Sequence, residues 1–212
     1  MATAYGNIAE VYSSGLKQPG KALDAAREEY RIIEKLVADH PGVYSFKSDQ
    51  AFSSRGMARR LKDLGRRPEA LEFYGKAREI WEGLLRDFHT VYIYQRSLAE
   101  INLDLADLDP PNRDSHLFQA VCGYSQGIDL IGFKKTKDQL TPEETATREK
   151  QGDRALELLR KMREHGYFQD PAKVEDVTQN RKLDPLRKRE DFQTLLADLK
   201  EKANSRAKNG DR

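Results

Sequence analysis

The residue types that most often carry enzyme chemistry are few in this chain: four histidines and one cysteine. The histidines are His40, His89, His116 and His165. They lie far apart, and none forms the H-E-x-x-H spacing or the Cys and His clusters of zinc sites. Cys122 lies between Val121 and Gly123 in an apolar stretch, which favours a small buried residue over a nucleophile. We therefore predict no catalytic, cofactor-binding or metal-binding residues.

Phosphate-handling enzymes need recognisable loops, and the sequence contains none of them. The P-loop pattern G-x-x-x-x-G-K-[ST] is absent, as are the Gly-rich loop, the V-A-I-K lysine, H-R-D and D-F-G of protein kinases. The segment 190–193 (EDFQ) is only superficially similar to the last of these. The nucleophile pattern G-x-S-x-G is also missing. We expect that the chain is not an enzyme and does not transfer phosphate from ATP.

Charged residues form two sets with the spacing of a single helix face. The basic set is Arg55, Arg59 and Lys62, and the acidic set is Glu100, Asp104 and Asp107. Steps of four and three place the members of each set on one face of a helix. Two interpretations stay open. The sets form the basic and acidic halves of a groove that binds a partner peptide, or they pair with each other across two neighbouring helices, where exposed pairs contribute about 0–1 kcal/mol each.

The elements that carry these sets belong to an internal repeat. Ala22-Leu23 aligns with Ala70-Leu71 at an offset of 48, and at least six further identities follow on the same offset. Within each copy the apolar residues recur at steps of three and four, as in Leu23, Ala26, Tyr30, Ile33 and Val37. This period is typical of amphipathic helices, and no stretch shows the alternation of a strand. The pattern predicts an all-α array.

Pro and Gly interrupt the apolar stripes at helix-length intervals, as at 65–68 (GRRP) and 109–112 (DPPN). Helices are predicted near 4–16, 21–39, 45–64, 68–88, 91–108, 114–132, 142–165 and 189–203. Thr141 to Glu144 has the pattern of a capping box, and Gly166 ends the helix that it opens. A loop with one short turn is expected between Gly166 and the last helix. Because each apolar stripe stops after about two heptads, a coiled coil is disfavoured.

The second copy resembles the tetratricopeptide repeat (TPR). After Gly65, the residues Ala70, Tyr74 and Ala77 match the small and aromatic positions of that family's second helix. Ala58 and Leu61 match the small and large positions of its first helix. The physical reason is that the two alanines let paired helices approach while the tyrosine fills the gap. The family's unit has about 34 residues, whereas the offset here is 48. The resemblance implies a right-handed superhelix of antiparallel helical hairpins.

The turn Asp39-His40-Pro41 and the end of the chain are similar to long-helix TPR arrays that follow bacterial serine/threonine protein kinases. At the end, the similar segments are 155–160 (ALELLR), 166–167 (GY), 183–187 (LDPLR) and 191–193 (DFQ). This resemblance implies three hairpins within 1–133, at about 4–39, 45–88 and 91–132. A closing helix, loop and capping helix are expected at 134–203, with a disordered tail at 204–212. Phe192, Leu195, Leu196 and Leu199 would form the buried face of the cap.

Composition restricts the class of protein. The chain has 37 Lys and Arg against 35 Asp and Glu, a net charge of +2, which argues against a nucleic-acid binder. One cysteine excludes an internal disulfide framework and fits a reducing compartment. No signal peptide and no membrane span is visible. A cytoplasmic location is therefore expected, with neither nucleic acid nor membrane as partner.

We expect a non-catalytic protein-interaction module that captures a partner peptide or helix of unknown identity on its concave face. The candidate partner-binding residues are Arg55, Arg59, Lys62, Glu100, Asp104 and Asp107. One alternative is the C-terminal regulatory region of a bacterial serine/threonine protein kinase whose catalytic domain lies upstream. Another is an architectural protein that self-associates through its N-terminal edge, where Ile8, Val11 and Tyr12 have no preceding cap.

Overall fold

A computed structural model describes residues 1–210, with side chains described through Arg206. It divides into two compact units, Met1–Pro110 (unit 1) and Pro111–Arg212 (unit 2). Residues 1–210 contain helices and turns and no strand, which confirms the all-α expectation. The hairpin predicted at 91–132 has one helix in each unit, and its pairing stays a prediction.

Unit 1 contains five α-helices and one π-helical turn. They are α1 (Ala2–Glu10), η1 (Val11–Gly15), α2 (Pro19–Asp39), α3 (Tyr44–Asp63), α4 (Arg67–Asp87) and α5 (Tyr92–Leu108). Their bounds lie close to those predicted from the apolar stripes and the Pro and Gly positions. Short connections between successive helices make neighbours antiparallel.

The turn between α3 and α4 shows how the local sequence ends one helix and begins the next. Gly65 adopts a left-handed conformation with φ of 72°, which costs glycine little because it has no Cβ. Its N–H donates to the carbonyl of Lys62, and the N–H of Arg66 donates to the carbonyl of Leu61. These two bonds form a Schellman motif. Pro68 then lies in the first turn of α4, where its missing N–H is not needed.

Small residues determine how closely α3 and α4 pack. Ala58 on α3 and Ala70 and Ala77 on α4 have no exposed surface. Tyr74, also fully buried, fills the space between these alanines, and Leu61 is 1% exposed. The packing that the repeat pattern predicts for these five residues is therefore present.

Aromatic rings extend this core toward α5. Trp81 on α4 is fully buried, and Phe52 on α3 meets it edge-on with ring centroids 4.8 Å apart. The ring of Tyr94 on α5 also contacts Trp81, with ring centroids 5.2 Å apart. Phe88 contacts both Tyr94 and Tyr44, at 6.5 and 4.6 Å. The cluster thus joins the N-terminal halves of α3 and α5 to the C-terminal half of α4.

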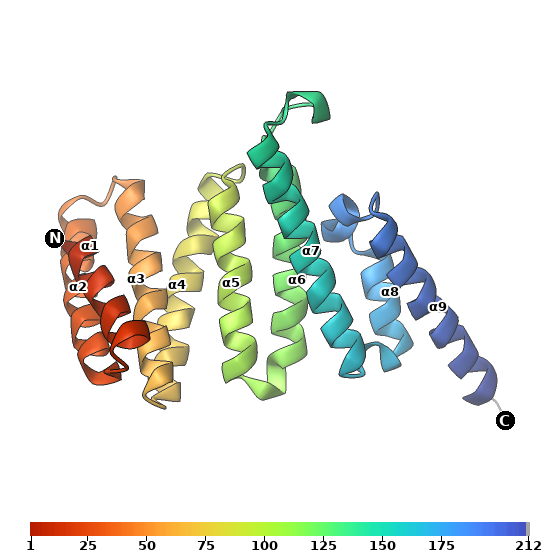
Figure 1. Cartoon of the computed structure of the whole chain (residues 1–212), viewed down its shortest axis with the longest axis horizontal. Coiled ribbons are helices and arrows are strands. Elements are labelled where there is room, and N and C mark those ends of the chain that lie inside the picture. Colours follow the sequence, from red (N-terminus) through yellow and green to blue (C-terminus); the bar gives the residue numbers. More distant parts are fainter. Residues whose placement is uncertain (211–212) are drawn as a thin grey trace. The chain divides into compact units, whose positions relative to one another are not determined.

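The helices of unit 1 form two layers. Each helix packs against the one before and the one after it, and Figure 1 shows them following one another along the unit. Ion pairs also connect α1 with α3 and α3 with α5, while Tyr30 on α2 meets Phe73 on α4 at 5.3 Å. Thus α1, α3 and α5 form one layer, and α2 and α4 form the other.

Unit 2 is also helical. Its elements are η2 (Pro110–Asn112, which begins at the unit boundary), α6 (Arg113–Leu130), η3 (Lys137–Gln139), α7 (Pro142–Glu164), η4 (Tyr167–Gln169), α8 (Pro171–Gln179), η5 (Arg181–Leu186) and α9 (Glu190–Gly210). The capping box of α7 is confirmed: the N–H of Glu144 donates to Thr141 Oγ1 at 3.1 Å, and the N–H of Thr141 donates to Glu144 Oε2 at 2.8 Å.

The segment expected to be a loop with one short turn contains a helix instead. Helix α8 begins after Asp170, whose carboxylate accepts the N–H of Ala172 at 2.9 Å, with Pro171 in the first turn. Val174 and Val177 are its buried residues. Helix α9 continues to Gly210, beyond the predicted end at 203. Residues 211–212 of the predicted tail lie outside the described residues.

One guanidinium joins the start of α9 to α7. Arg189 donates to Glu149 Oε2 at 3.1 Å, to Asp153 Oδ1 at 2.6 Å and to Asp191 Oδ2 at 2.9 Å. Along α9 after Arg189, three of the four apolar residues predicted for its buried face are buried, with exposures of 4% or less. They are Phe192, Leu195 and Leu199.

A half-buried carboxylate lies where α1 crosses α2 in unit 1. Glu29 of α2 approaches the backbone of Gly6 so closely that a Cβ there would lie 2.3 Å from its carboxylate oxygen. Burial raises the pKa of Glu29, the negative charge of Asp49 raises it further, and the positive charge of Arg60 opposes both. The charged form of Glu29 therefore costs stability at neutral pH.

We predict that Glu29→Gln raises the melting temperature at pH 7. The folded pKa lies above the ordinary value of 4.5, so the cost is present at neutral pH and disappears as the pH falls and the folded protein takes up the proton. The gain should therefore vanish below about pH 4. Glu28→Gln is the matched control, because exposed Glu28 pairs with Arg31 and should show no gain. Equal melting temperatures for Glu29→Gln and the parent at pH 7 would contradict the prediction.

Candidate interaction face

The basic and acidic sets predicted from the sequence lie on α3 and α5, in the same layer of unit 1. Arg55 is the centre of their contact. Its Nε donates to Asp104 Oδ2 at 2.7 Å, and its Nη1 donates to Glu100. The side chain of Arg55 is 17% exposed, so this cluster is largely shielded from water. Arg96 binds the other oxygen of Glu100 at 2.8 Å.

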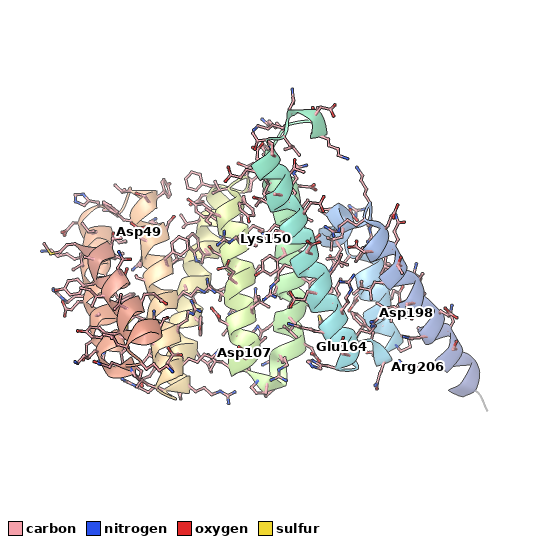
Figure 2. The ribbon with its side chains drawn as sticks, in the orientation of Figure 1. Asp49, Asp107, Lys150, Glu164, Asp198 and Arg206 are labelled. Atoms are coloured by element: carbon pink, nitrogen blue, oxygen red, sulfur yellow. The ribbon has the colours of Figure 1, made fainter. Side chains whose placement is uncertain are left out.

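A second ion pair lies farther along the same two helices. Lys62 Nζ donates to Asp107 Oδ2 at 3.1 Å, with side-chain exposures of 34% and 69%. Figure 2 shows Asp107 near the Leu108 end of α5 and Asp49 near the Tyr44 end of α3. On the opposite flank of α3, Arg60 pairs with Glu10 of α1 at 2.6 Å. Ion pairs thus connect α3 to α1 and to α5, its two neighbours in the same layer.

The electrostatics of Glu100 and Arg55 reflect this mutual pairing. Burial alone would raise the pKa of Glu100, but hydrogen bonds and positive charge from Arg96 and Arg55 lower it below its ordinary value. Burial likewise opposes the charge on Arg55, and the carboxylates of Asp104 and Glu100 outweigh it and raise the pKa of Arg55. Glu100 and Arg55 therefore both stay charged at neutral pH, and each stabilises the charged form of the other.

Arg59 differs from the rest of the predicted set. Its side chain is exposed, and it forms no hydrogen bond or ion pair with any described residue. The structure thus brings five of the six predicted residues together as internal ion pairs and leaves Arg59 available. The partner-binding role of all six stays a prediction. Arg59 is the member without an ion pair, and its positive charge acts only at longer range on the carboxylate of Glu10, whose pKa it helps to lower.

Two residues that the charge pattern did not indicate lie on the same face as Arg59. Phe52 is 45% exposed although its ring contacts buried Trp81. Gly56 lies one turn further along α3. Apart from its two chain neighbours and the backbone of its own helix, no atom lies within 4 Å of the position a Cβ would occupy. The available signal was a glycine inside a helical pattern, where glycine is less favourable than alanine.

The other chemically reactive residues do not form a site. Cys122 is buried, and burial raises the pKa of its thiol to about 11, so the thiolate is scarce at neutral pH. Residues 1–206, whose side chains are described, hold no group of three or more His, Cys, Asp or Glu side chains suited to a metal ion. Among the described helices, none combines the length and apolarity needed to cross a membrane.

We predict that Arg55→Ala lowers the free energy of unfolding by roughly 1–3 kcal/mol, because it leaves the largely buried Asp104 without its ion-pair partner and Glu100 with Arg96 alone. Lys62→Ala is the matched control: it removes an exposed pair on the same helices and should cost about 0–1 kcal/mol. Urea denaturation measures both.

The effect of Arg55→Ala should also depend on pH. Since the folded pKa of Glu100 is lowered, the stabilisation is present above the ordinary value of 4.5 and is lost as the pH falls through the folded value. Equal stabilities of Arg55→Ala and Lys62→Ala at pH 7 would contradict the shielded role of Arg55.

Comparisons with known proteins add no further constraint to this geometry. No protein-family model, no curated protein and no solved structure matches the chain significantly. Function is therefore inferred from the residues of the α1, α3 and α5 layer and from the contacts that they make.

Proposed function

We propose that this protein is a non-catalytic interaction module that binds a partner peptide on the outer face of the α1, α3 and α5 layer. In this proposal, unit 1 has the arrangement of TPR-like hairpins, with α1, α3 and α5 as first helices and α2 and α4 as second helices. The first helices of such hairpins line the concave surface of a repeat array.

One observation carries the proposal: Arg55 and Lys62 of α3 are paired with carboxylates of α5, while Phe52 is left half exposed at the surface of this layer. Burial of the rest of that ring on a partner would gain about 25 cal/mol for each Å² removed from water. The ring is already held edge-on against Trp81. Little side-chain freedom remains to be lost on binding, which favours its use as an anchor.

The proposal is tested by selection of random peptides displayed on phage against the whole chain. We expect enriched peptides that bind the purified protein and lose most of their affinity for Phe52→Asp, because the charge prevents burial of an apolar partner at that position. Fluorescence anisotropy with labelled synthetic copies of the peptides measures the affinity.

Phe133→Asp is the matched control for this experiment. Phe133 belongs to unit 2 and is 47% exposed, close to the 45% of Phe52, so the two substitutions change surface polarity equally. Peptides that bind Phe52→Asp as tightly as the parent would overturn the proposed face. Failure of the selection to enrich any peptide would overturn the proposed function itself.

A second candidate function is self-association through the N-terminal edge of unit 1. Ile8 of α1, Val11 of η1 and Leu16 are 43%, 58% and 53% exposed. Apolar side chains close together on a surface mark interaction sites in many proteins. Light scattering over a concentration series separates the two functions, because self-association predicts a mass that increases with concentration and decreases again in Val11→Lys.

A further inference from the structure

The face of α3 contains a glycine that the fold itself does not require. Gly56 lies inside α3, where glycine is less favourable than alanine because its backbone loses more conformational freedom on folding. Nothing lies within 4 Å of its absent Cβ, so no neighbouring helix needs the space. Its φ is not in the left-handed region, which excludes a conformational reason. The missing side chain leaves open space on this face, which the backbone of a partner can approach.

The residues beside Gly56 supply two different anchors. Phe52 and Arg59 are seven residues apart, so they lie within about 20° of each other around α3 and about 10 Å apart along it. Arg55 points from this line toward α5, where it binds Asp104, and Arg60 points toward α1, where it binds Glu10. The line from Phe52 to Arg59 is therefore the outward face of α3.

We propose that Phe52, Gly56 and Arg59 form a docking stripe for an extended acidic peptide whose backbone passes over Gly56. This inference rests on the proposed function and specifies the partner's chemistry. An apolar side chain of the peptide covers Phe52, and a carboxylate of the peptide pairs with Arg59. The missing Cβ of Gly56 allows the peptide backbone to approach the helix between these two contacts.

The positive charge of Arg59 indicates that the partner peptide carries an acidic residue. Arg59 is an exposed guanidinium that forms no hydrogen bond or ion pair with a described residue, although its positive charge helps to lower the pKa of Glu10 on α1. Its neighbours Arg55, Arg60 and Lys62 each form an ion pair with a carboxylate. A guanidinium binds a carboxylate through two parallel hydrogen bonds, which fixes orientation as well as charge. A basic peptide would instead be repelled at this position.

The spacing of Phe52 and Arg59 indicates that the bound peptide is extended. A polyproline II segment has three residues per turn and rises about 3.1 Å per residue, so its side chains i and i+3 share a face and lie about 9 Å apart. This matches the separation of about 10 Å between Phe52 and Arg59 along α3. We therefore expect an apolar residue and an Asp or Glu three positions apart in the bound peptide.

The decisive variant is Gly56→Ala, because it should improve folding and impair binding at once. An added methyl group should raise the melting temperature by roughly 1–4 °C. It should also weaken the selected peptides about tenfold, since the peptide backbone must move outward from both anchors. A variant that is more stable yet binds less well cannot be explained by partial unfolding.

Gly75→Ala is the matched control. Gly75 lies inside α4, also with nothing within 4 Å of its absent Cβ, and its charged neighbours Lys76 and Arg78 each pair with a glutamate of the same helix. It should raise the melting temperature to a similar extent and leave peptide affinity unchanged. Arg59→Glu should weaken the acidic peptides about tenfold or more and strengthen copies in which Lys replaces the acidic residue.

The outcomes separate this inference from the function on which it rests. If peptides are enriched and depend on Phe52, but bind Gly56→Ala as tightly as the parent or show no acidic residue near the apolar one, the docking stripe is wrong and the interaction module stands. If no peptide is enriched, both are wrong. If the only species that binds is a second copy of the chain, light scattering shows it and the acidic-peptide assignment is overturned.

Discussion

The close packing of α3 against α4 is the contact on which the rest of unit 1 depends. Ala58, Ala70 and Ala77 have no exposed surface, so their methyl groups set the distance between the helices. Tyr74 and Trp81 fill the space that remains, and α5 packs on the other side of this cluster through Tyr94. A larger residue at an alanine position would separate α3 from α4 and displace the ring that supports Phe52.

Because the core of unit 1 is thin, ion pairs contribute much of what holds the α1, α3 and α5 layer together. Each helix buries one apolar stripe on the opposite layer, so α1, α3 and α5 are joined to each other mainly by polar side chains. Arg55, Arg60 and Lys62 all serve this purpose and are held by carboxylates within unit 1.

Much of the fold could be predicted from local patterns. The repeated stripes placed the helices, Gly65 and Pro68 located the turn between α3 and α4, and Thr141 with Glu144 identified the start of α7. Helix α8 was missed because its buried residues are only Val174 and Val177, too few to show a period. Its start depends on the Asp170 cap, a signal that is equally common in loops.

The sequence by itself determined which side chains share a helix face, because a period of 3.6 residues is a local property of the backbone. It placed Arg55, Arg59 and Lys62 together on one face and Glu100, Asp104 and Asp107 on another. Only the tertiary structure decided that Arg55 and Lys62 meet those carboxylates while Arg59 does not. The partners come from helices more than forty residues apart, and the choice depends on how far α3 and α5 are rotated about their axes when their apolar stripes pack on α4.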